Sequence, residues 1–190
     1  MTFSEYKYLI WSDLYRVTGD KSVSKLLREL VLGEGYKFCF WFRTSSWLRT
    51  HPLRPLLYPL AWLVLRHYRY KLGISIAPGT DIGPGFYIGH FGGIVVHGKV
   101  KIGRNCNISQ GVTLGLKQRG ENQGCPTLGD NVYIGPGAKI FGGITLGNHV
   151  AVGANAVVTK SIPDNAVAVG IPAKVISEEG SAEIINKTDY

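Results

Sequence analysis

The sequence predicts a mostly β protein that is built around a parallel β-helix, with a helical region on its N-terminal side. Three observations lead to this prediction. An aliphatic residue recurs every six positions between residues 76 and 158. The residue three places later is usually glycine, asparagine or histidine, which tolerate a positive φ, and the residue four places later is usually small or apolar. The thirteen aliphatic positions are Ile76, Ile82, Ile88, Ile94, Ile102, Ile108, Leu114, Leu128, Ile134, Ile140, Leu146, Val152 and Val158.

A period of six excludes two competing fold classes. An amphipathic α-helix repeats every 3.6 residues, and glycine and proline recur throughout this stretch. Collagen needs glycine at every third position, which this chain lacks. A short strand followed by a turn, repeated three times, closes one triangular coil of eighteen residues with its aliphatic side chains inside. We therefore expect four to five such coils within residues 76–176.

Two irregularities interrupt the period and indicate loops. The spacing between Ile94 and Ile102 is eight, so two extra residues must bulge outward. The spacing between Leu114 and Leu128 is fourteen, which inserts a polar, protruding loop over residues 115–127. Specificity often resides in a loop that a rigid scaffold holds out.

Residues 1–75 predict helices. Apolar residues recur at helical spacing over residues 4–18 and 22–32, and glycine follows each stretch. From residue 36 an aromatic-rich segment is divided by three prolines into two further helices. At the other end, we expect the chain to leave the coils after Val158 and residues 177–190 to form a polar tail, either a short helix or disordered.

The formal charge of +8 is concentrated in the first part of the 190-residue chain. Residues 1–75 hold 12 Lys or Arg against 5 Asp or Glu, and no acid occurs from Gly35 to Thr80. One interpretation is a helical cap with solvated arginines, and the other is peripheral contact with an anionic membrane surface. The longest uncharged run, Pro55 to Leu65, is too short to span a bilayer. Nucleic acid is not an expected partner, since no binding module is recognisable.

The three cysteines give neither an even disulfide framework nor a Cys-x-x-Cys metal spacing. We expect Cys39 and Cys106 to be buried and Cys125, in the protruding loop, to be exposed. The first fifteen residues lack the basic segment and apolar core of a secretory signal. These features favour a cytoplasmic protein, with attachment to the inner face of the membrane as the second interpretation.

The string IGxxxxI, together with the ending VGANAVVTKSIPDNAVAVGIPAKVI, resembles the hexapeptide-repeat acyltransferases. This resemblance implies a left-handed coil, which spacing alone does not establish. It also implies a homotrimer with active sites between neighbouring prisms and acetyl-CoA as co-substrate. The family's coenzyme contacts match Ala154, Lys160 and Lys174, whose lysines would pair with phosphates. The alternative is that both lysines are solvated surface charges.

His90 is the candidate general base. Its segment YIGHFGGIVV resembles DHATGIVV of the serine acetyltransferases, whose histidine deprotonates the acceptor hydroxyl. His97, in the eight-residue bulge, is the rival base, and His149 occupies a turn position that suits a structural role. His51 and His67 have no motif around them. The spacing of His90, His97 and His149 does not suit the three-histidine zinc site of related hydratases, so no metal is expected.

Several positions depart from the serine acetyltransferase pattern. Gly89 and Ser75 replace two aspartates, one before the histidine and one that orients it. In the loop, Gly124 and Cys125 replace the arginine and histidine that hold the serine carboxylate. Because unpaired charges in a closed pocket are costly, these losses predict a neutral acceptor. The expected function is therefore acetyl-CoA-dependent O-acetylation of a carbohydrate hydroxyl, as in the exopolysaccharide and capsule O-acetyltransferases.

Two other functions stay open. The first is serine O-acetylation in cysteine biosynthesis, which keeps the same chemistry on a different acceptor. The second is a non-catalytic trimeric scaffold, in which Gly89 and Ser75 would be signs of a decayed site. The retained His90 and the retained coenzyme positions argue against the scaffold.

Overall fold

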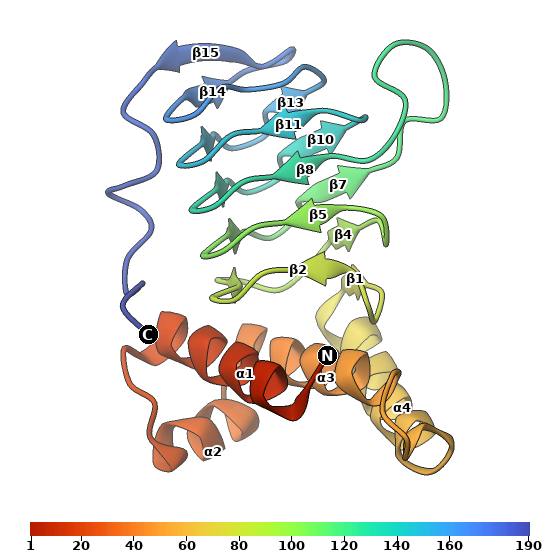
Figure 1. Ribbon diagram of the computed structural model, residues 1–190. Helices are drawn as coiled ribbons and strands as arrows, with labels where there is room; N and C mark the ends of the chain where they lie inside the picture. The colour runs from red at the N-terminus through yellow and green to blue at the C-terminus, as the bar shows by residue number, and fades with distance from the viewer.

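The computed structural model describes all 190 residues and consists of a β-helix standing on a base of four helices (Figure 1). The helices are α1 (Phe3–Thr18), α2 (Val23–Val31), α3 (Gly35–Leu48) and α4 (Arg54–Leu72).

The prism has three faces of parallel strands. The first face holds β1 (Ile74–Ile76), β4 (Ile94–Val96), β7 (Thr113–Gly115), β10 (Lys139–Phe141) and β13 (Val157–Val158). The second holds β2 (Asp81–Ile82), β5 (Lys101–Ile102), β8 (Thr127–Leu128) and β11 (Thr145–Leu146). The third holds β3 (Tyr87–Ile88), β6 (Asn107–Ile108), β9 (Tyr133–Ile134), β12 (Ala151–Val152) and β14 (Val167–Val169), with β15 (Lys174–Ser177) antiparallel at its edge.

The strand register confirms the eighteen-residue coil. Val95 pairs with Thr113, eighteen residues further on, and Lys139 pairs with Val157 at the same interval. Ser75 pairs with Val95 at an interval of twenty, and Thr113 pairs with Lys139 at twenty-six. The eight extra residues are the protruding loop, as predicted. The two extra residues are not where the sequence places them: the interval of twenty ends at β4, and the next interval, from Val95 to Thr113, is regular, so the insertion lies in the turn of residues 89–93 before β4. The predicted bulge between Ile94 and Ile102 is therefore wrong, and His97 lies at a regular corner, because Val96 and not Ile94 pairs with Ile76 and Leu114.

The interior of the prism is the aliphatic column that the repeat predicts. All thirteen repeat positions are buried, and so are small residues of the second column such as Cys106, Ala138 and Ala156. Burying one such aliphatic side chain stabilises the fold by roughly 1.5–3 kcal/mol, so the stack is the main stabilising element of the prism. The predicted β-helix with N-terminal helices is confirmed.

Asparagine fills the turns of one corner as the pattern predicts. Asn105 and Asn131 have φ of 54° and 56°, and His149 continues the column with φ of 57°. The Asn105 side-chain amide donates to Oδ1 of Asn131 at 3.0 Å. His149 therefore occupies a regular turn position of this corner, one coil beyond Asn131.

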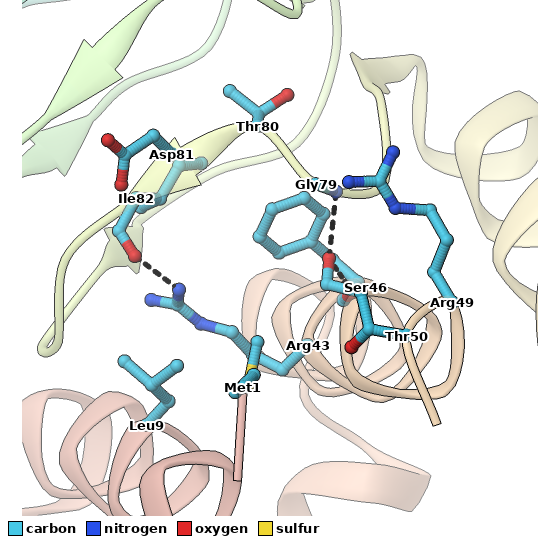
Figure 2. Close-up of a pocket in the computed structure, with 11 residues that line it drawn as sticks. Met1, Leu9, Arg43, Ser46, Arg49, Thr50, Gly79, Thr80, Asp81 and Ile82 are labelled. Carbon is cyan, nitrogen blue, oxygen red and sulfur yellow. Dashed lines mark hydrogen bonds between the residues drawn. The ribbon is translucent and has the colours of Figure 1, made fainter. Parts of the chain in front are cut away.

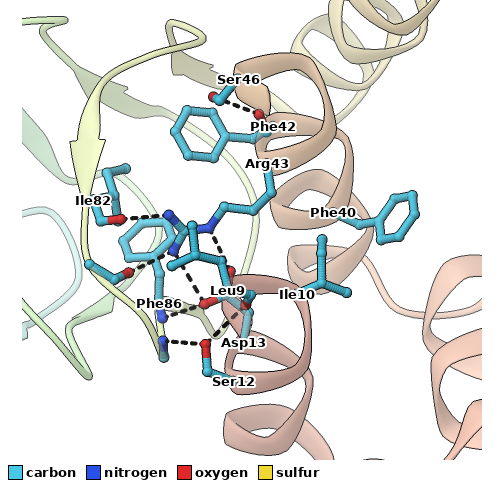
Figure 3. Close-up of polar contacts among 12 residues, drawn as sticks. Leu9, Ile10, Ser12, Asp13, Phe40, Phe42, Arg43, Ser46, Ile82 and Phe86 are labelled. Atoms are coloured by element: carbon cyan, nitrogen blue, oxygen red, sulfur yellow. Dashed lines mark hydrogen bonds and ion pairs between the residues drawn. The ribbon is translucent and has the colours of Figure 1, made fainter. Parts of the chain in front are cut away.

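A buried ion pair fastens the helical base to the first coil (Figure 3). The Arg43 guanidinium on α3 donates to both carboxylate oxygens of Asp13 on α1, at 2.9 and 3.3 Å. Arg43 also donates to the carbonyls of Ile82 and Gly83 at 2.5 and 2.6 Å, and Asp13 accepts the N–H of Phe86 at 2.8 Å. Burial raises the pKa of the Asp13 carboxyl, and the Arg43 charge opposes that rise. The network fixes α1 and α3 against the prism.

α4 begins with Pro55 in its first turn and accommodates Pro59 in its interior, so only the first of the three predicted breaks separates it from α3. It packs on α3 and ends at Gly73, where β1 follows directly. Leu56, Leu60 and Leu63 on α4 are exposed. None of the helices is both long enough and apolar enough to span a membrane.

The C-terminal segment differs from the expectation of a free or helical tail. The chain stays in the coils beyond Val158, because β14 adds a further strand and β15 folds back on it. The tail then runs down beside the prism to the helices (Figure 1). There the Tyr190 hydroxyl donates to Asn105 Oδ1 at 2.7 Å, and the Lys187 ammonium donates to the carbonyl of Val17 at 3.0 Å. The polar composition concealed this packing, since it depends on two scattered residues, Ser181 and Ile185, that are buried.

Candidate active site

His90 lies in the turn between β3 and β4, on the first corner of the prism. Its side chain is exposed, and its imidazole makes no hydrogen bond within the chain. Two glycines of positive φ follow it, Gly92 at 104° and Gly93 at 66°. The N–H of Gly92 donates to the carbonyl of Leu72 at 2.9 Å, and the N–H of Ile94 donates to that of Gly73 at 3.1 Å. The turn is therefore fixed on the end of α4, while the imidazole stays available to a ligand.

Ser75 does not act as a partner of His90. Its hydroxyl accepts a hydrogen bond from Nη2 of Arg69 at 3.0 Å. Gly89 has no side chain to offer. Neither of the two positions that replace the family's aspartates therefore orients the candidate base.

His97 and Cys125 form a pair that the sequence analysis missed. His97 follows β4 at the second corner, Cys125 ends the protruding loop, and the Cys125 sulfur lies 3.1 Å from Nδ1 of His97. The N–H of Lys99 also donates to this Nδ1, at 3.2 Å, so Nδ1 is an acceptor and the ring proton lies on Nε2. Partial burial raises the pKa of the Cys125 thiol, and Lys99 opposes the rise. Cys125 is thus a thiol that donates to His97. A signal was present, since β4 and β7 are neighbours on the first face and the residues that follow them, His97 and the protruding loop, share one corner of consecutive coils.

The backbone conformation at position 124 favours glycine. Its φ is 130°, a conformation that side chains rarely adopt, and a Cβ here would lie 3.2 Å from the Cα of Gly143. Gly124 and Lys117 exchange two backbone hydrogen bonds, of 2.9 and 3.0 Å, which close the protruding loop at its base. An arginine in this position would require a different loop conformation.

The structure does not bring His90 together with the loop residues of the same chain. His90 precedes β4, and the pair of His97 and Cys125 follows it, so the full strand separates the two corners. Three strand residues span about 10 Å. Within one chain the two corners therefore do not form one compact site.

The three coenzyme candidates are exposed near the far end of the prism. Ala154 follows β12, Lys160 follows β13, and Lys174 begins β15. Neither lysine ammonium forms an ion pair, because Asp13–Arg43 is the one salt bridge of the chain. Three strand steps of about 4.8 Å separate β4 from β13, so the lysines lie roughly 14 Å above the level of His90 along the prism. Only an elongated ligand could contact both ends.

Two cavities adjoin the helical base. One of about 330 Å³ lies between α3 and the first coil and includes Arg49 and Asp81, but none of the predicted site residues (Figure 2). The other, of about 370 Å³, lies between the end of α4 and the first face, and it includes Arg66, Arg69 and Ser75. From the sequence alone, these two arginines are expected to be solvated or membrane-facing charges.

Comparison with known proteins identifies a set of relatives. The family described as bacterial transferase hexapeptide (six repeats) matches residues 125–160. Serine acetyltransferase of Synechococcus elongatus is 35% identical over 162 residues, covering 85% of this chain and 64% of that protein. The soybean serine acetyltransferase apoenzyme has a TM-score of 0.75 at 31% identity, covering 91% of this chain and 69% of that one. Serine acetyltransferase of Brucella abortus in complex with coenzyme A has a TM-score of 0.77 at 27% identity, covering 94% and 70%. The chain spans 53 to 64% of the length of the curated relatives it matches.

These findings correct the predicted acceptor. The assignment to the exopolysaccharide and capsule branch, with a carbohydrate hydroxyl as acceptor, is wrong, because the relatives at 35 to 43% identity are serine acetyltransferases. The error has a physical origin. Gly124 and Cys125 remove two charge partners for a carboxylate from the loop, but a folded site also draws on residues that lie far away in the sequence. The family match agrees with the left-handed β-helix that the resemblance implied.

Proposed function

Because the chain belongs to the hexapeptide-repeat acyltransferases of the serine acetyltransferase type, we propose that it transfers the acetyl group of acetyl-CoA to the hydroxyl of L-serine. The observation that carries the proposal is the similarity to serine acetyltransferases over 85% of this chain. The product would be O-acetylserine, together with free coenzyme A.

In the proposed mechanism, His90 is the general base. Its unpartnered imidazole accepts the hydroxyl proton while the serine oxygen attacks the thioester carbonyl. The new C–O bond forms as the C–S bond breaks, and the coenzyme leaves as a thiolate that takes up a proton. A positioned general base contributes roughly 10² to 10⁴ in rate. Ala154, Lys160 and Lys174 would contact the coenzyme, and the two lysines suit its phosphates because they have no carboxylate partner in the chain.

We further propose that the active unit is a homotrimer. The corner that carries His90 and the corner that carries His97 and Cys125 lie at opposite ends of β4. Placing the second corner of one protomer against the first corner of the next would bring the two together. The protruding loop, with Gly124 and Cys125, would then form one wall of the acceptor site of a neighbouring protomer.

The test is an acetyl-transfer assay on the purified protein with acetyl-CoA and L-serine. His90→Ala should lower kcat by roughly 10² to 10⁴, since the hydroxyl loses its proton acceptor. His67→Ala is the matched control, because His67 is also exposed but lies on α4 away from the turn. Full turnover in His90→Ala would remove His90 from its role, and a wild-type protein that does not acetylate L-serine would overturn the proposed function.

Peripheral membrane contact of the helical base is a separate proposal. Its support is the exposed row of Leu56, Leu60 and Leu63 on α4, within the acid-free stretch from Gly35 to Thr80. Each basic residue near an anionic surface contributes roughly 1 kcal/mol, which salt would screen. Sedimentation with anionic vesicles at low salt should deplete the protein from the supernatant, and Leu60→Asp should weaken this effect. Equal recovery with anionic and zwitterionic vesicles would contradict the proposal.

A further inference from the structure

The cavity of about 370 Å³ at the end of α4 is a candidate subsite for a small anionic group. Its walls are Arg66, Arg69 and Tyr70 on α4 and Ser75 and Val95 on the first face. Its volume exceeds that of a water-filled crevice and suits a small ligand such as an amino acid.

The positive charge in this cavity is not compensated. No aspartate or glutamate occurs from Gly35 to Thr80, and neither arginine belongs to the chain's single ion pair. Both guanidinium groups are nevertheless held in place. The Arg66 guanidinium lies over the rings of Trp62 and Tyr70, at 5.4 and 5.1 Å from their centroids, and Arg69 donates to the Ser75 hydroxyl at 3.0 Å. Two positioned cations without an anion indicate a site for one.

The cavity adjoins the turn that carries the candidate base. Gly73 and Ile94 belong to its wall, and Ile94 is joined to Gly73 by a backbone hydrogen bond of 3.1 Å. His90 lies two residues before Gly92, which is bonded to the end of α4 in the same way. Two residues span at most roughly 7 Å, so the backbone of His90 lies within that distance of Gly92, in the turn that leads into the cavity wall at Ile94.

We propose that Arg66 and Arg69 bind the carboxylate of the acceptor and thereby present its hydroxyl to His90. This inference rests on the proposed function and names the residues that select the acceptor. The planar guanidinium matches a carboxylate through paired, charge-assisted hydrogen bonds. The two arginines would supply from α4 the charge that the protruding loop lacks at Gly124.

Serine at position 75 supports the same assignment. An aspartate here, as in the pattern that the sequence resembles, would form an ion pair with Arg69 and neutralise it. The Ser75 hydroxyl orients the guanidinium through its oxygen and leaves the positive charge free. The replacement of the aspartate and the presence of Arg69 are therefore complementary.

The experiment compares L-serine with L-serinamide, which keeps the hydroxyl and the amine but has no carboxylate. Arg69→Gln and Arg66→Gln should each raise the KM for L-serine by roughly ten- to one-hundred-fold, as expected when one charged hydrogen bond is lost, and leave the KM for acetyl-CoA unchanged. The KM for serinamide should change little in these variants, so the preference for L-serine over L-serinamide should be lost. Ser75→Asp should have the same effect without removing an arginine. Lys71→Gln is the control, because Lys71 is an exposed cation of the same helix outside the cavity.

The outcomes separate the inference from the proposed function. A rise in the KM for acetyl-CoA instead of L-serine would assign the arginines to the coenzyme phosphates and overturn the inference. Equal losses for serine and serinamide, or none for either, would overturn it as well. A wild-type protein without serine turnover would reject the proposed function, and calorimetric titration with L-serine then decides the inference. Weaker binding in Arg69→Gln than in Lys71→Gln would support it, and equal or undetectable binding in wild type and both variants would reject it.

Discussion

Asp13→Asn is expected to cost a large part of the stability of the protein, because it breaks the ion pair that joins the helical base to the prism. The asparagine keeps the shape of the side chain but leaves the buried Arg43 guanidinium without its anion. Both side chains are almost completely buried, at 0% and 3% exposure. Removing one partner of such a pair costs about 3–5 kcal/mol. For a chain of this length, each kcal/mol lowers Tm by about 2–4 °C, so the expected shift is roughly 6 to 20 °C.

Scanning calorimetry at a fixed protein concentration measures this shift. Asp81→Asn removes an exposed carboxylate on β2 and should change Tm very little. The double variant Asp13→Leu with Arg43→Met removes both charges, so it should lose less stability than the sum of the two single changes. An Asp13→Asn protein that unfolds within about 2 °C of the wild type would refute the reasoning, and strictly additive losses would show that the two side chains are not coupled.

Two further predictions concern the coenzyme and the assembly. If Lys160 and Lys174 meet phosphates of the coenzyme, changing either to Ala should raise the KM for acetyl-CoA several-fold with a smaller change in kcat, because such contacts bind ground and transition states alike. Steady-state kinetics measures this, Lys187→Ala on the tail should leave the KM for acetyl-CoA unchanged, and an unaltered coenzyme affinity in the double lysine variant would reject the assignment. Sedimentation velocity at micromolar concentration should give a trimer, since in the proposed arrangement the two corners of the candidate site meet between protomers. A stable monomer with full activity would contradict that arrangement.

The fold could be predicted from the sequence because every coil repeats the same information. Each of the thirteen aliphatic residues independently indicates the same inward column, so two interruptions could be recognised. The one after Leu114 is where the sequence places it, but the other lies before Ile94 and not after it, because both Ile94 and Val96 point inward and either could be counted as the repeat position. The contacts of the candidate site have no such redundancy. The pairing of Cys125 with His97 and that of Arg69 with Ser75 join irregular segments to strands, and no period relates them. The prediction of a carbohydrate acceptor is wrong for the same reason, because it depends on two loop residues, Gly124 and Cys125, and not on the contacts of the folded site.

The course of the C-terminal tail changes how the solenoid should unfold. In an open stack of coils each coil contacts only its neighbours, so the terminal coil can fray alone. Here the residues after β15 return along the outside and reach α1, where Lys187 and Tyr190 attach. The last coil is therefore strapped to the first through the helical base, and the linear array becomes a closed loop of contacts. Unfolding of the last coil should therefore break the contacts of Lys187 and Tyr190 as well, which couples the unfolding of the two ends of the prism.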